Sequence, residues 1–253
     1  MPWRFTGISW TLFGSTYSYS YSFGGDRGST EARAGHFPAV GWEGGALPYR
    51  VGHRKLGMWL FIVSDSLTFS ALLIGYSYLR ASNVWPTPFP FYPSIVFSSV
   101  MTFCLLSSSL TMVFGVSASS RGDKAAARKW ILATIAFGLT FIILHLIEWN
   151  HLIQEGMRPF FLPEHWVKVF TGPDGKPPTP LFGATFFTIT GLHMFHVFTG
   201  AIYLSVVAAR VKKLKHEDVE ISGLYWHFVD LVWMFVFPLI YIMSVDVGGH
   251  LAR

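Results

Sequence analysis

The sequence is poor in charge and almost lacks cysteine, and each shortage excludes a class of protein. Only 13% of its 253 residues are Asp, Glu, Lys or Arg, whereas an average soluble domain carries about 25%. The single cysteine, Cys104, excludes an internal disulfide and a thiolate cage for a metal. In place of charge, 51% of the residues are hydrophobic and 17% are aromatic. This balance is typical of an integral membrane protein.

The formal net charge of +5 does not indicate nucleic acid as a partner. The basic residues cluster beside apolar runs, where lipid headgroups and orientation signals explain their placement. We therefore expect phospholipid partners and no nucleic acid.

Residues 1–50 form a low-complexity tail rich in Tyr, Ser and Gly, and residues 51–253 form the membrane domain. Tyr and Ser alternate over residues 17–23, and a period of two is also compatible with a strand. A tail of this composition is flexible when alone, so we favour an irregular tail that a partner subunit holds in place.

Five apolar runs in residues 51–253 reach the roughly 20 residues that a helix needs to cross a bilayer. The predicted fold is an all-α integral membrane bundle of five transmembrane helices, preceded by an irregular N-terminal tail of about 50 residues. Prolines break residues 83–93. Residues 154–180 form a polar loop with a short interfacial piece around Trp166. The predicted spans are 56–79, 94–117, 130–153, 181–209 and 222–245.

Basic residues gather at one end of these spans, and the positive-inside rule makes that end cytoplasmic. The rule predicts a cytoplasmic N-terminus and a periplasmic C-terminus. The opposite end carries Arg80, Arg158, Lys168, Lys176 and Arg253. The residues at the basic end are Arg50, Arg54, Lys55, Arg121, Lys124, Arg128, Lys129, Arg210, Lys212, Lys213 and Lys215.

Ionisable side chains inside the spans cost at least about 2.5–3.5 kcal/mol each to insert, so they normally face the interior of the bundle. Three of the spans carry such residues in pairs spaced i, i+3, which lie on one helix face. We predict a buried polar network made of Asp65, His145, Glu148, His193, His196, His227 and Asp230.

A metal site is the alternative interpretation of these residues, since helix bundles do bind metals through i, i+3 carboxylate and His pairs. Glu148 lies about 27 Å from the cytoplasmic end of its predicted helix. Asp230 lies only about 12 Å from the cytoplasmic end of its own predicted helix, so the two carboxylates cannot share one ion. Depth does not exclude a metal site made by Asp230 and the histidines near it. We favour a network that fixes helix packing, with no metal.

A second set of residues has small or aromatic side chains that suit close contact between helices in a membrane. We expect this set to pack on another subunit or on lipid. Its members are Gly191, Gly200, Tyr225, Trp226 and Trp233.

Four collinear segments carry a family resemblance over about residues 52–246. They are Gly57 to Asp65, with a Ser before the buried acid; Leu144 to Trp149, with a Glu before an aromatic residue; Phe182 to Gly200, with Thr-Gly, two His three apart and a Gly; and Tyr225 to Trp233, with Tyr-Trp-His-Phe-Val-Asp. In these segments the chain resembles subunit III of the haem–copper oxidases of the cytochrome c oxidase type, in the five-helix form known from bacteria. It departs from the family at Asp65, where Glu is usual, and at Met194, where Gly is common.

The resemblance implies a non-catalytic subunit of a proton-pumping terminal oxidase of aerobic respiration, in the bacterial cytoplasmic membrane. Such a subunit has no catalytic residue and no redox centre, since the haems and copper reside in subunits I and II. It packs on subunit I, binds phospholipid, and supports proton uptake and stability during turnover. Subunit II, small extra subunits or a respiratory supercomplex are further expected partners.

Other functions remain open from the sequence. Within the superfamily, the alternatives are subunit III of a quinol oxidase and the related accessory protein of nitric oxide reductase. Outside it, the alternatives are a stand-alone transporter, although no internal repeat is visible, and a membrane metalloenzyme.

Overall fold

The structure, a computed structural model, describes residues 11–12, 15–16, 52–171 and 175–245. The chain divides into two units, Met1–Gly41 and Trp42–Arg253, which are described separately. In the first unit, β1 (Thr11–Leu12) pairs antiparallel with β2 (Ser15–Thr16). The alternating Tyr and Ser segment at 17–23 lies outside the described residues.

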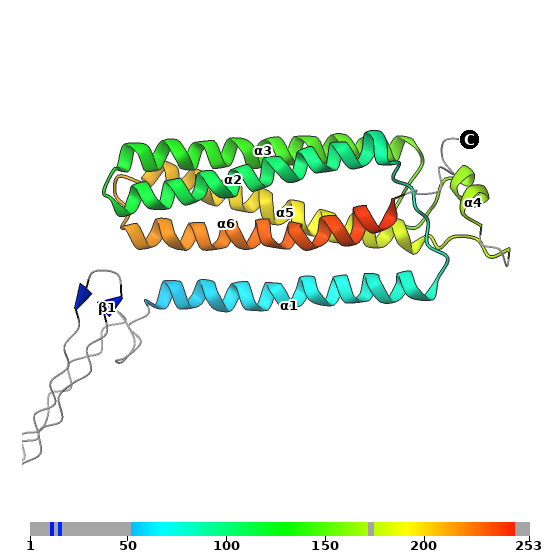
Figure 1. Cartoon of the computed structure of the whole chain (residues 1–253), viewed down its shortest axis with the longest axis horizontal. Helices are drawn as coiled ribbons and strands as arrows, with labels where there is room; N and C mark the ends of the chain where they lie inside the picture. The colour runs from blue at the N-terminus through cyan, green and yellow to red at the C-terminus, as the bar shows by residue number, and fades with distance from the viewer. Residues whose placement is uncertain (1–10, 13–14, 17–51, 172–174, 246–253) are drawn as a thin grey trace, which may run out of the picture. The chain divides into compact units, whose positions relative to one another are not determined.

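The described part of the second unit contains five helices long and apolar enough to cross a membrane, and this confirms the predicted fold class (Figure 1). The first, third and fourth are regular α-helices. The second and fifth each join an α-helix to shorter helical turns. Their bounds are α1 (His53–Ser82), η1 (Phe91–Ile95) with α2 (Val96–Ser120), α3 (Lys124–Gln154), α5 (Leu181–Arg210), and α6 (His216–Val236) with η2 (Phe237–Tyr241) and η3 (Ile242–Ser244).

Local sequence explains where the helices begin and end. α1 ends at Ser82, just before the proline-rich stretch that cannot continue a helix. Between α2 and α3 the chain reverses at Gly122, whose φ of 79° suits glycine. The Asp123 carboxylate then accepts a hydrogen bond of 2.9 Å from the Ala126 backbone N–H and caps α3. This short turn makes α2 and α3 antiparallel neighbours.

The loop before α5 folds back onto the bundle. It contains a short helix, α4 (Glu164–Phe170), whose Trp166 is buried, so the predicted short piece is present and its aromatic ring is covered by protein. Gly183 allows the loop to approach α5, because a Cβ there would overlap the Arg158 carbonyl oxygen.

The core lies among α2, α3, α5 and α6, and α1 stands at its edge, where it contacts α6 and α5 (Figure 1). Of the α1 side chains, those of Phe69 and Tyr76 are buried. α1, α3 and α6 begin, and α2 and α5 end, at the end of the bundle rich in Lys and Arg, which we call the basic end. We call the other end the loop end.

Candidate functional site

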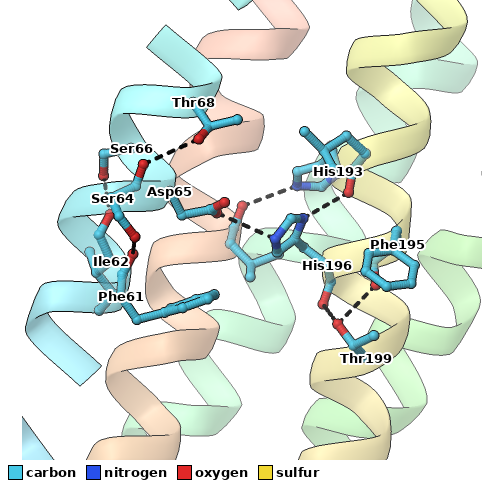
Figure 2. A network of polar contacts seen from close by, with 12 residues as sticks. Phe61, Ile62, Ser64, Asp65, Ser66, Thr68, His193, Phe195, His196 and Thr199 are labelled. Atoms are coloured by element: carbon cyan, nitrogen blue, oxygen red, sulfur yellow. Dashed lines mark hydrogen bonds and ion pairs between the residues drawn. The ribbon is translucent and has the colours of Figure 1, made fainter. Parts of the chain in front are cut away.

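One polar contact within the bundle joins α1 to α5. Asp65 Oδ2 lies 3.4 Å from His196 Nε2, and both side chains are largely buried (Figure 2). The other ring nitrogen, His196 Nδ1, lies 2.9 Å from the Leu192 carbonyl oxygen. The Phe69 ring packs edge-on against the imidazole at 5.5 Å. The contact therefore ties two helices that share little apolar surface.

The geometry of this pair shows which ring nitrogen of His196 carries a hydrogen. Nδ1 of His196 donates its N–H to the Leu192 carbonyl, since a carbonyl oxygen can only accept. A proton between Nε2 and the Asp65 carboxyl then belongs either to a neutral acid beside a neutral imidazole or to a carboxylate beside an imidazolium. Both arrangements are neutral as a pair, which lowers the cost of placing the pair inside a membrane.

Glu148 forms a second cluster near the loop end. Its carboxyl accepts hydrogen bonds from the Ser98 hydroxyl at 2.9 Å and the Tyr241 hydroxyl at 2.6 Å. His145 Nδ1 is 3.6 Å away on the same helix face. The cluster joins α2, α3 and η2, and it borders a cavity of about 170 Å³ that also contacts Phe89 and Phe97.

His145 and His193 meet around Trp233 in the interior of the bundle. Their ring centroids lie 5.6 Å and 4.9 Å from that of Trp233, and Phe141 packs on both imidazoles. Nε2 of His193 donates to the Val229 carbonyl at 3.1 Å. Both histidines are thus held by aromatic stacking, with one backbone hydrogen bond between α5 and α6.

His227 and Asp230 lie on a third face, between α6 and α2. His227 Nδ1 is 2.6 Å from the Ser109 hydroxyl, which also lies close enough to the Asp230 carboxyl to interact with it. Ser109 on α2 therefore connects the imidazole with the carboxyl.

The seven predicted polar residues lie at several helix interfaces, where Asp65 contacts His196 and His145 lies beside Glu148. Sequence reasoning missed the hydroxyls that partner them, because Ser and Thr in an apolar run usually bond to their own helix. The available signal was the high Ser and Thr content of α2. On α2, the hydroxyls of Ser98 and Ser109 bond to Glu148 and His227. Those of Thr102 and Ser108 accept from Trp233 and Trp226.

The five predicted packing residues contact this chain's own helices. Gly191 approaches Trp149, and Gly200 approaches the rings of Tyr225 and Trp226. Trp226 and Trp233 are 1% and 0% exposed and donate their indole N–H groups to hydroxyls of α2.

The described residues contain no group of three or more His, Cys, Asp or Glu placed to hold a metal ion. Glu148 accepts hydrogen bonds from Ser98 and Tyr241, and Asp230 lies beside Ser109.

Comparisons with known proteins agree with the resemblance read from the sequence motifs. The family described as cytochrome c oxidase subunit III matches residues 160–245. The cytochrome c oxidase subunit 3 of Corynebacterium diphtheriae is 29% identical over 221 residues, which cover 81% of this chain and 98% of that protein.

Two further relatives come from oxidases named for different electron donors. The cytochrome c oxidase subunit 3 of Thermostichus vulcanus is 30% identical over 198 residues, covering 76% of this chain and 88% of the relative. The cytochrome bo(3) ubiquinol oxidase subunit 3 of Pseudomonas putida is 30% identical over 196 residues, covering 75% and 86%. The five membrane-spanning helices, the paired polar side chains between those helices and the likeness to these relatives all agree. The chain belongs to the subunit III family of the haem–copper oxidases.

Proposed function

We propose that this chain is a non-catalytic subunit of a respiratory haem–copper oxidase, which packs on the catalytic subunit and sustains its proton uptake during turnover. The observation that carries the proposal is that its ionisable groups pair across helix interfaces. Asp65 faces His196, and Glu148 faces Ser98 and Tyr241. Groups engaged in this way hold helices together, and oxygen reduction takes place at the haems and copper of subunits I and II.

The exposed side of α1 supports docking of a further helix or of lipid. Its lipid-facing positions include Leu60, Leu67 and Ile74, each more than 60% exposed. Subunit I is the partner we propose to contact directly, with subunit II, small extra subunits or a supercomplex beyond it.

Phospholipid is the second proposed partner. A groove of about 410 Å³ runs between α1 and α6, and its lining is mostly apolar. Phe69, Phe228 and Phe235 border it. An acyl chain has the shape and polarity to fill such a groove.

For orientation we propose that the basic end faces the cytoplasm of a bacterial cell, with the C-terminus periplasmic. The α2–α3 turn at Arg121, Gly122 and Asp123 then faces the cytoplasm. A cysteine placed in this turn is expected to react with an impermeant reagent only after the membrane is opened. Reaction from the outside of intact cells would show that the orientation is the opposite of the one proposed.

The electron donor is a property of the whole complex. The relatives carry the names of both cytochrome c oxidases and a ubiquinol oxidase. We place this chain with the cytochrome c oxidases, and a quinol oxidase is the second candidate. Haem analysis and donor specificity of the purified complex separate the two.

Co-purification tests the proposal against the transporter and metalloenzyme alternatives. A tag on this chain, in mild detergent, is expected to recover a large haem-bearing subunit in equal amount. The recovered complex should consume oxygen. Recovery of the chain alone, active in transport or with a stoichiometric metal, would overturn the proposal.

A further inference from the structure

A groove between α2 and α6, lined by polar as well as apolar side chains, opens at the basic end and takes no part in the function proposed above. It holds a pocket of about 440 Å³. The polar side of the pocket consists of Ser117 and Ser120 on α2 and His216, Glu220 and His227 on α6. Gly223 allows α2 and α6 to approach closely beside the pocket, because a Cβ there would lie 3.0 Å from the Val116 side chain.

The polar residues of α6 continue along one face beyond the pocket. His216, Glu220, His227 and Asp230 follow spacings of four, seven and three, which keep them on a single stripe of the helix. From His216 to Asp230 the stripe climbs about 21 Å at 1.5 Å per residue. Ser109 on α2 bridges its last two members. A polar stripe of this length reaches the middle of a bilayer about 30 Å thick.

Two buried atoms along the stripe have no hydrogen-bond partner among the described residues. They are His216 Nδ1, beside the pocket, and Oδ1 of Asp230, at the closed end. A buried polar atom without a partner costs about 1–3 kcal/mol, so a native structure normally supplies one. Water is a suitable partner because five polar side chains line the pocket, and its volume is far larger than that of one molecule.

Charge in the groove is already balanced at its mouth. Glu220 is paired with Lys55 of α1 at 2.7 Å, and the Arg121 guanidinium donates to the Ser117 hydroxyl at 2.7 Å. The titratable groups left along the stripe are His216, His227 and Asp230. An acyl chain would leave these groups without partners, whereas water satisfies them.

We propose that the α2–α6 groove is a hydrated inlet, open at the basic end, which brings water and protons to Asp230 through His227 and Ser109. The inlet lies on another helix interface from the Asp65–His196 pair, and it does not depend on the function proposed above.

The three groups at the closed end can pass one proton with the charges balanced. A proton from the inlet binds Nε2 of a His227 that carries its hydrogen on Nδ1, and an imidazolium forms. Nδ1–H then gives its proton to the Ser109 oxygen while the Ser109 hydroxyl proton moves to the Asp230 carboxylate. The products are a neutral imidazole protonated on Nε2, a hydroxyl and a neutral carboxyl.

Silver-ion protection of engineered cysteines tests the inlet. Cys104→Ser gives this chain a cysteine-free background. Single cysteines then replace Ser117, Ser109 or Asp230, with Leu110→Cys on the exposed side of α2 as matched control. The assembled complex in nanodiscs is treated with Ag⁺, denatured and alkylated, and this chain is analysed by mass spectrometry. Ag⁺ is small enough for a narrow aqueous path and combines with a thiolate, which forms only where water reaches it.

The expected result is protection at all three inlet positions and full alkylation of Leu110→Cys. Adding Ser117→Trp to the Ser109→Cys chain fills the mouth and is expected to remove protection. Protection of Ser117→Cys alone would show that the groove is dry beyond its mouth, as an acyl chain would make it, and would overturn the proposal. If Ser109→Cys stays protected when Ser117→Trp is also present, silver ions do not enter through the mouth of the groove, and the proposed route is wrong. Neither readout requires oxidase activity.

Discussion

α1 and α6 are both long and apolar enough to cross a membrane, yet they are held in the bundle by different forces. In their most apolar stretches, 6% of α1 and 50% of α6 are buried within the protein. α6 packs with large rings such as Trp226 and Trp233 against its neighbours. α1 relies on polar contacts at three levels, namely Lys55 to Glu220, Asp65 to His196, and Tyr76 to Ser244.

The difference shows how a membrane protein can position a helix with little buried surface. Lipid tails are as apolar as the side chains they replace, so apolar burial does not drive helices together within a bilayer. Close packing and hydrogen bonds do, and α1 has few close contacts. Its polar ties specify where it lies while its outer face stays available for a partner.

The sharpest contrast is between two helical glycines, one in the core and one on α1. A Cβ at Gly138 would lie 2.6 Å from the Trp226 ring, whereas a Cβ at Gly75 would meet nothing within 4 Å. Gly138→Ala is expected to lower the free energy of unfolding by about 3 kcal/mol through overpacking. Gly75→Ala should raise it by about 0.5–1 kcal/mol, because alanine favours a helix. Unfolding of the full chain in mixed micelles measures both. Equal effects would remove the distinction between core and edge.

The sequence predicted the five spans well because a bilayer demands long, uniform apolar runs, and proline and glycine mark the breaks. It predicted the ionisable residues that lie inside the bundle, such as Glu148 and His193. It could not predict their partners. Tyr241, for example, lies 93 residues from Glu148 in sequence, and only the packing of helix on helix brings the two together.

A smaller loss is expected from the core hydrogen bond between Tyr241 and Glu148. Tyr241→Phe removes the 2.6 Å bond and keeps the ring stacked on Phe89. A typical hydrogen bond contributes about 0.5–1.5 kcal/mol, and because this one is short and buried, a loss near 1.5 kcal/mol is expected in the same unfolding measurement. Tyr76→Phe, which removes the 3.2 Å contact with Ser244 at the edge, is the matched control. We expect it to cost less, and the reverse order would contradict the comparison.

Asp65→Asn tests the tie in the middle of α1. The amide can still donate to His196 Nε2, so the expected loss is only about 0.5–1 kcal/mol. We expect the number of turnovers before inactivation to stay at the wild-type value, because the contact positions α1. A shortened turnover lifetime would instead assign the carboxyl a role in proton transfer.

The smallest effect is expected at the ion pair nearest the surface. Arg54 lies 2.9 Å from Asp218, but its side chain is 80% exposed. Exposed pairs contribute about 0–1 kcal/mol, and salt weakens them further. Arg54→Gln should change the free energy of unfolding by less than about 0.5 kcal/mol. A larger loss that disappears at high salt would show that ion pairs at the basic end, and not packing, hold α1 in place.

We infer that this chain sustains the oxidase without performing its chemistry. The direct test compares oxygen consumption over many turnovers in the intact complex and in a complex stripped of this chain. The stripped complex is expected to begin at a rate close to that of the intact one and then to lose proton uptake and activity, and adding the chain back should restore its lifetime. A stripped complex with no initial activity would contradict the claim and place this chain close to the catalytic centre.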